Sequence, residues 1–144
     1  MRKVFALIML VALVGCSEKG AKLSCSDKEV TDLALEITKT ESRNQFFKVF
    51  FKKEAGILTR DIADMKFDEF KAKATSDMGK KVVNETENLT DSLKLADVRL
   101  KEKNETTGML TCATKLLING EGSDISYTAQ RTDEGKIYVE VFGL

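Results

Sequence analysis

The spacing of the hydrophobic residues changes near residue 93, and this change constrains the fold more than any other feature. Before it, apolar residues recur at the spacing of one helix face, as at Val30, Leu33, Ala34 and Ile37. After it, apolar and polar residues alternate in four stretches, separated by the glycine-containing segments 104–108, 119–124 and 132–135. Such segments are typical of hairpin turns. The sequence therefore predicts helices followed by an antiparallel meander of about four strands.

Three segments predict the helical part. Residues 26–29, "SDKE", fit a capping box, so we expect the first helix to begin there and to run to about Asn44. Residues 46–53, "FFKVFFKK", are predicted to continue that helix, because no Gly or Pro occurs before Gly56; an extended stretch is the alternative. A second helix is predicted from Thr59. The polar residues 75–92 are predicted to be a loop with a helical turn.

The predicted sheet has one apolar face that other elements must cover. Its alternating apolar residues are Ile125, Tyr127 and Ala129, then Ile137, Val139 and Val141. Only the amino-terminal helices are available to cover them. We therefore expect an α+β fold with one or two N-terminal helices packed on a roughly four-stranded antiparallel meander sheet. This element order resembles the cystatin-like and NTF2-like folds, in which a long helix lies across a curved sheet.

The first 17 residues have the pattern of an export signal. Two basic residues precede an apolar run from Val4 to Val14, which is too short to cross a bilayer as a helix. "LVGC", residues 13–16, then resembles the lipobox of bacterial prolipoproteins. The resemblance implies cleavage after Gly15 and attachment of lipid to Cys16. An ordinary secretory signal peptide is the alternative.

The lipobox resemblance also implies a domain organisation and a location. Residues 1–15 would be the cleaved signal peptide, residues 16–25 the lipidated cysteine and its tether, and residues 26–144 one small folded domain. Two or more acyl chains hold a protein firmly at a membrane, at about 0.8 kcal/mol per buried CH₂. Ser17 follows Cys16 where an aspartate would indicate the inner membrane, so the outer membrane is expected.

Two cysteines remain once Cys16 is assigned to the lipid. Cys25 and Cys112 form an even pair in a protein expected in an oxidising compartment, which predicts a disulfide. A zinc or redox pair is the rival, but two distant cysteines in a chain without histidine make a poor metal site. A free buried thiol is the other alternative.

The composition excludes several kinds of chemistry. The chain has no histidine, so neither a Ser-His-Asp nor a Cys-His catalytic arrangement can be built. Its formal net charge is zero, which provides no basic face for nucleic acid. The sequence contains no phosphate-binding glycine loop, dinucleotide fingerprint or EF-hand loop. We therefore expect no enzymatic activity, no catalytic residue, no metal, no cofactor and no nucleic-acid partner.

Three aspartates lie at helical spacing in the predicted second helix: Asp61, Asp64 and Asp68. They could form a weak cation site or an acid–base pair. A solvated helix face opposite an apolar one is the interpretation that we favour.

Four phenylalanines, Phe46, Phe47, Phe50 and Phe51, are the candidate hydrophobic site. At helical spacing their rings cover too wide an arc for one narrow stripe. Part of that arc could form an exposed patch for a partner, or a ligand pocket against the sheet. The alternative is that these rings are simply the core of a small domain.

Three segments match the Asn-x-Thr acceptor sequence for glycosylation, at Asn84, Asn88 and Asn104. Residues 102–106, "EKNET", also fit the acidic-x-Asn-x-Thr form that some bacteria glycosylate.

The sequence leaves three functions open. The first is a lipid-anchored envelope protein that acts by binding an envelope protein partner, for example as an exclusion factor, an inhibitor of a wall hydrolase or a subunit of an envelope machine. The second is a small-ligand carrier or enzyme with a pocket between helix and sheet. The third is a purely structural envelope lipoprotein.

Overall fold

The computed structural model describes residues 22–144. The predicted signal peptide, the lipidated Cys16 and Ser17 lie outside the described residues. The described chain begins with four helices: α1 (Lys28–Ala55), α2 (Arg60–Asp64), α3 (Phe67–Lys73) and α4 (Asp77–Asp91). Four strands follow: β1 (Lys94–Lys103), β2 (Leu110–Ile118), β3 (Glu121–Arg131) and β4 (Ile137–Phe142).

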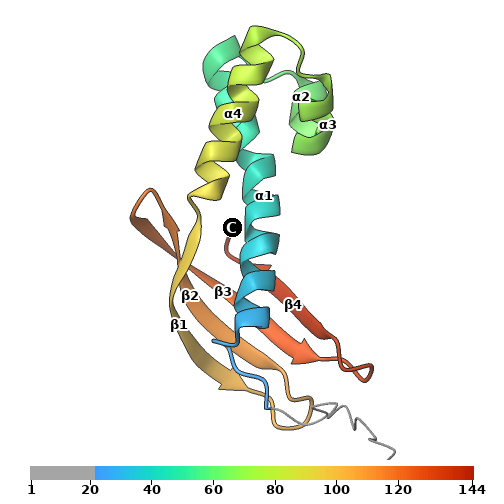
Figure 1. Cartoon of the computed structure of the whole chain (residues 1–144), viewed down its shortest axis with the longest axis vertical. Helices are drawn as coiled ribbons and strands as arrows, with labels where there is room; N and C mark the ends of the chain where they lie inside the picture. The colour runs from blue at the N-terminus through green and yellow to red at the C-terminus, as the bar shows by residue number, and fades with distance from the viewer. Residues whose placement is uncertain (1–21) are drawn as a thin grey trace, which may run out of the picture.

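The strands form one antiparallel sheet in the order β1-β2-β3-β4 (Figure 1). The α+β fold class and the meander predicted from the alternating residues are therefore confirmed. The turn between β2 and β3 contains only Asn119 and Gly120, with φ angles of 51° and 87°. Two left-handed residues of this kind give a turn whose twist matches that of the flanking strands.

Helix α1 is long enough to contribute to several hydrophobic clusters, of which the two at its ends are the largest. Its 28 residues correspond to about 42 Å at 1.5 Å per residue. The first half crosses one face of the sheet, and the second half packs with the other helices beyond it (Figure 1). The core under the first half contains Val30 and Ala34 with Leu110, Tyr127 and Val139. The core around the second half contains only helical residues, which are Phe47, Phe67, Phe70, Val82 and Val83.

The start of α1 differs from the predicted capping box. The helix begins at Lys28 with Asp27 as its N-cap, and the carboxylate of Asp27 accepts a 2.8 Å hydrogen bond from the amide of Ser24. Asp27 thus stabilises the turn before the helix, and no side-chain cap from Ser26 is formed. The predicted continuation through residues 46–53 is confirmed. The helix ends at Gly56, whose φ of 78° suits a residue without Cβ.

The prediction of a loop over residues 75–92 is wrong, because these residues form α4. Ser76 caps the helix, its hydroxyl oxygen accepting a 3.1 Å hydrogen bond from the amide of Gly79. Helix α4 packs against α1, and its buried residues include Thr86 and Thr90, both fully buried. Each hydroxyl donates to the carbonyl oxygen four residues earlier, at 2.7 Å, so these polar side chains occupy core positions without leaving a donor unpaired.

The predicted second helix is interrupted. α2 ends at Asp64 and α3 begins at Phe67, with Met65 and Lys66 extended between them. The amide of Phe67 donates to Oδ1 of Asn44 at 2.9 Å, which fixes the start of α3 against α1. None of the helices within residues 22–144 is long and apolar enough to cross a membrane.

Candidate functional site: the outer face of the sheet

The predicted disulfide between Cys25 and Cys112 is present. The two Cα atoms are 5.8 Å apart, and the bond joins the segment before α1 to the middle of β2. Both cysteines are buried in the core between α1 and the sheet. The disulfide therefore has a structural position, linking the start of the domain to the middle of the sheet.

Tyr127 lies beside the disulfide and holds the same segment. It is the cross-strand partner of Cys112, and its hydroxyl donates a 2.6 Å hydrogen bond to the carbonyl oxygen of Cys25. Its side chain is fully buried. Burial disfavours the phenolate and raises the pKa of Tyr127 to about 12. Tyr127 is therefore a neutral structural donor at physiological pH.

The four predicted phenylalanines are divided between the two ends of the fold. Phe47, Phe50 and Phe51 belong to the helical core, where the rings of Phe47 and Phe70 stack with centroids 5.3 Å apart. Phe46 instead packs with Leu93 at the sheet. The structure thus does not bring these four rings together as one patch.

The predicted ligand pocket between α1 and the sheet is replaced by packed side chains. The residues that face one another there, including Ala34, Leu110 and Tyr127, are buried in one continuous core. Phe46 also packs against buried residues, Leu116 and Ile125. Four hollows described on the surface of residues 22–144 lie elsewhere, and none of these four is lined by a phenylalanine of α1.

The three aspartates do not share one helix face. Asp61 and Asp64 lie on α2, whereas Asp68 lies on α3 beyond the break, and all three are exposed. Asp64 lies 3.9 Å from the guanidinium of Arg60, with both side chains largely in solvent. Within the described part of the chain, no group of three or more acidic or cysteine side chains is placed to hold a metal ion.

The face of the sheet turned away from α1 carries a row of residues that crosses all four strands. In register, Arg99 of β1 lies opposite Ala113 of β2, Ala113 opposite Ser126 of β3, and Ser126 opposite Phe142 of β4. These residues line one hollow of about 400 Å³. The small side chains of Ala113 and Ser126 form its floor, because neither fills the space between the larger residues at its two sides.

The two sides of this hollow, which we call the outer-face groove, differ in chemistry. Arg99 and Lys101 of β1 provide two cations on one side. Phe142 of β4 provides an aromatic ring on the other, 45% exposed. Asp124 also lines the groove. The groove can therefore hold an extended segment that offers an acidic group to β1 and an apolar group to β4.

The sequence predictions did not include the outer-face groove. Most of its residues are polar or small positions of the alternating stretches, and the sequence patterns considered above concern only the apolar positions. Which of them lie side by side depends on strand register, and β1 has irregularities at residues 96–99 and 100–102 that alter it. The exposed aromatic residues of β4, Tyr138 and Phe142, were the available signal, since both point away from the core.

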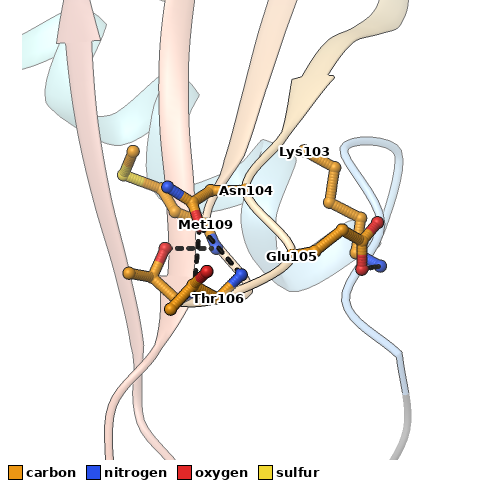
Figure 2. Close-up of polar contacts among 6 residues, drawn as sticks. Lys103, Asn104, Glu105, Thr106 and Met109 are labelled. Atoms are coloured by element: carbon orange, nitrogen blue, oxygen red, sulfur yellow. Dashed lines mark hydrogen bonds and ion pairs between the residues drawn. The ribbon is translucent and has the colours of Figure 1, made fainter.

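The three acceptor sequences for glycosylation have different surroundings. Asn84 and Asn88 lie within α4, whose buried threonines Thr86 and Thr90 are the third residues of those sequences. Asn104 lies instead in the exposed turn between β1 and β2 (Figure 2). There its Oδ1 accepts hydrogen bonds from the amides of Thr106 and Thr107 at 2.9 and 3.0 Å.

Comparisons of the chain with protein-family models, with curated proteins and with solved structures gave no match.

Proposed function

We propose that the protein is a small lipid-anchored lipoprotein of the bacterial cell envelope that acts without catalysis, by binding an envelope protein through the outer-face groove. The lipid is attached to Cys16, and the expected location is the outer membrane. The lipobox residues 13–16 support the anchor. The buried disulfide supports an oxidising compartment. The position of α1 across one face of the sheet supports the likeness to cystatin-like folds.

The observation that carries this proposal is the chemical asymmetry of the outer-face groove. Cations at Arg99 and Lys101 and a half-exposed ring at Phe142 stand on opposite sides of a floor of small side chains. Exposed aromatic and arginine side chains are the residue types that most often dominate binding energy at protein interfaces. The groove is open along the surface, so it suits a segment of a partner protein better than an enclosed small molecule.

The packing beneath α1 favours this function over a small-ligand carrier or enzyme. A carrier of the predicted kind needs a cavity between helix and sheet, and that space is filled by buried side chains such as Ala34, Leu110 and Tyr127. The charged residues that line the outer-face groove are Arg99 and Lys101 of β1 and Asp124 of β3, the single acidic group among them. These three charged groups can complement charges on a partner, whereas catalysis would need an acid and a base both placed against one substrate.

The proposal is tested by a photo-crosslinking amino acid at two exposed positions of the full chain in its native envelope. A benzophenone side chain replaces the ring of Phe142 in the groove, and in the control it replaces Val49, which is 64% exposed on α1. A specific protein adduct is expected from position 142 and not from position 49. Charge reversal by Arg99→Glu and Lys101→Glu together is expected to abolish that adduct.

The possible results separate binding through the groove from a purely structural role. Equal adducts from positions 142 and 49, or an adduct that survives the charge reversal, would show that the groove is not the binding surface. Crosslinking to peptidoglycan alone would favour the structural lipoprotein. The anchor is checked separately, by incorporation of a palmitate analogue that is lost in Cys16→Ser. That result tests the location without depending on the groove.

A further inference from the structure

The turn between β1 and β2 presents one glycosylation acceptor sequence on the surface. We propose that Asn104 is a site of N-linked glycosylation, modified by a membrane-embedded bacterial oligosaccharyltransferase of the type that reads acidic-x-Asn-x-Thr. The part of the argument that concerns distance from the membrane rests on the lipid anchor of the proposed function. The remaining part rests on the surroundings of the three acceptor sequences alone.

Exposure of the threonine separates the acceptor sequences. An enzyme that reads a hydroxyl two residues after the asparagine must be able to reach that hydroxyl. Thr86 and Thr90 are fully buried, and each hydroxyl donates to a carbonyl oxygen of α4. Thr106 is exposed, as are all residues from 101 to 108. In the folded protein only the third of these sequences can be recognised without opening a helix.

Sequence context separates them in the same way. Glu102 supplies the acidic residue two positions before Asn104 and is exposed. The corresponding positions before Asn84 and Asn88 are Val82 and Thr86, which carry no charge and are buried. The acidic requirement and the requirement for access therefore select the same asparagine.

The turn also orients the asparagine side chain for reaction (Figure 2). Both partners of the Asn104 side chain are backbone N–H donors, so its oxygen must face them. Its nitrogen, Nδ2, consequently points away from the turn. The turn is held by its own backbone, because the amide of Gly108 donates to the carbonyl oxygen of Asn104 at 2.8 Å. A sugar on Nδ2 would leave these hydrogen bonds in place.

The position of the turn brings Asn104 to the anchored end of the molecule. Lys103, its neighbour, lines the same surface hollow as Lys22, the first described residue. Six residues lead from Cys16 to Lys22 and reach at most about 20 Å when extended. The helices α2 and α3 lie at the opposite end of the molecule (Figure 1). A lipid on Cys16 would therefore keep Asn104 near the inner membrane, which contains the transferase and its lipid-linked sugar donor, until the protein is transferred to the outer membrane.

The reaction needs a polyprenyl-pyrophosphate-linked oligosaccharide as the second substrate. A bond forms between Nδ2 of Asn104 and the anomeric carbon of the first sugar. The bond from that carbon to the pyrophosphate oxygen breaks, and the polyprenyl pyrophosphate leaves with the electron pair. One proton of Nδ2 passes to a base of the transferase. No residue of this chain besides the acceptor sequence takes part.

The test expresses the full chain in bacterial cells with and without such a transferase and its lipid-linked oligosaccharide, and measures the intact mass. A gain of one oligosaccharide is expected only with the transferase. It is expected to be lost in Asn104→Gln and in Thr106→Ala, which removes the hydroxyl but keeps the backbone hydrogen bond to Asn104. Thr107→Ala, in the same turn but outside the acceptor sequence, is expected to keep the gain, as are Asn84→Gln and Asn88→Gln.

Two results would overturn the proposal. One is the absence of a mass gain in cells where a control acceptor protein is glycosylated. The other is a gain that persists in Asn104→Gln. Failure of the lipid anchor is read separately, from palmitate labelling of the same preparations. An unlabelled protein that carries the sugar would contradict the anchor and support the site, and a labelled protein without the sugar would do the reverse.

Discussion

The hydroxyl of Tyr127 donates a 2.6 Å hydrogen bond to the carbonyl oxygen of Cys25, a residue 102 positions earlier in the chain. Tyr127 also lies opposite Cys112, to which Cys25 is covalently bonded. One short segment before α1 is therefore attached to the sheet twice, once by a disulfide and once by a buried hydrogen bond.

Removal of the Tyr127 hydroxyl should destabilise the protein measurably. Tyr127→Phe leaves the Cys25 carbonyl without this donor, which is expected to cost about 1–2 kcal/mol of unfolding free energy. Tyr138→Phe is the matched control, because Tyr138 is 53% exposed and its hydroxyl loss should change stability by less than about 0.5 kcal/mol. Urea unfolding of both variants checks this, and equal effects would contradict the structural role of Tyr127.

The same tyrosine predicts a loss of stability at high pH. Its pKa is about 12 in the folded protein and 10.0 for an ordinary tyrosine. The unfolded chain therefore releases this proton first, so the contribution is fully present below pH 10 and is lost as pH rises towards 12. The urea midpoint of the wild type should fall more steeply in this window than that of Tyr127→Phe. Parallel pH profiles would show that burial of the phenol does not affect stability.

The disulfide should contribute substantially to stability. It closes a loop across 87 positions, and a native disulfide typically stabilises a protein by about 2–4 kcal/mol. Reducing agent is expected to lower the melting temperature of the wild type. The double variant Cys25→Ala with Cys112→Ala should have a lower melting temperature than the wild type, and the reducing agent should not change it. An unchanged wild-type melting temperature after complete reduction, verified by thiol titration, would contradict this prediction.

The helical core should be more sensitive than the surface of the same helix. Phe47 is fully buried and stacks on Phe70, so Phe47→Ala is expected to cost about 3–5 kcal/mol. Val49 lies two residues away and is 64% exposed, so Val49→Ala should change the unfolding free energy by less than about 0.5 kcal/mol. Similar costs for the two substitutions would mean that the second half of α1 does not pack as described.

The start of α4 offers a test of the helix that sequence reasoning missed. Ser76→Ala removes the acceptor for the Gly79 amide and is expected to destabilise by about 1 kcal/mol. Thr75→Ala changes an exposed neighbour outside the cap and should be close to neutral. Urea unfolding measures both effects. If Thr75→Ala lowers the unfolding free energy as much as Ser76→Ala does, Ser76 is not the N-cap of α4.

The strands were predictable because three separate signals agreed. Alternation identified the segments, glycine-containing turns separated them, and residues such as Ile125 and Tyr127 identified the inner face. The helix α4 was not predicted because Thr86 and Thr90 occupy its buried face, so its apolar period was concealed. A threonine whose hydroxyl donates a hydrogen bond to a carbonyl oxygen of its own helix can be buried in the core. In a sequence pattern, however, threonine counts as a polar residue and predicts a solvent-facing position.

The candidate site was less predictable than the fold. The disulfide could be predicted from the number of cysteines and the expected oxidising compartment, without knowledge of the geometry. The outer-face groove depends on which residues of four strands share a row, and the irregular register of β1 places Arg99, rather than its neighbours, opposite Ala113. The four phenylalanines were predicted as a candidate patch for a partner or ligand, with a core position as the alternative; in the structure Phe47 is buried, and Phe46, Phe50 and Phe51 are partly buried against buried residues. Phe46 and the other three rings lie in different clusters, because α1 is long enough to pass from the sheet to the other helices, and residue type alone does not define that length.

The disulfide also determines how mechanical load would pass through an anchored molecule. If lipid at Cys16 holds one end and a partner on the outer-face groove pulls on the sheet, tension reaches Cys25 along the tether. It then crosses directly into β2 through the covalent bond to Cys112. Helix α1 begins after Cys25, so it lies outside this path. The packing of α1 on the sheet would therefore stay unstrained while the strands and one sulfur bridge bear the force.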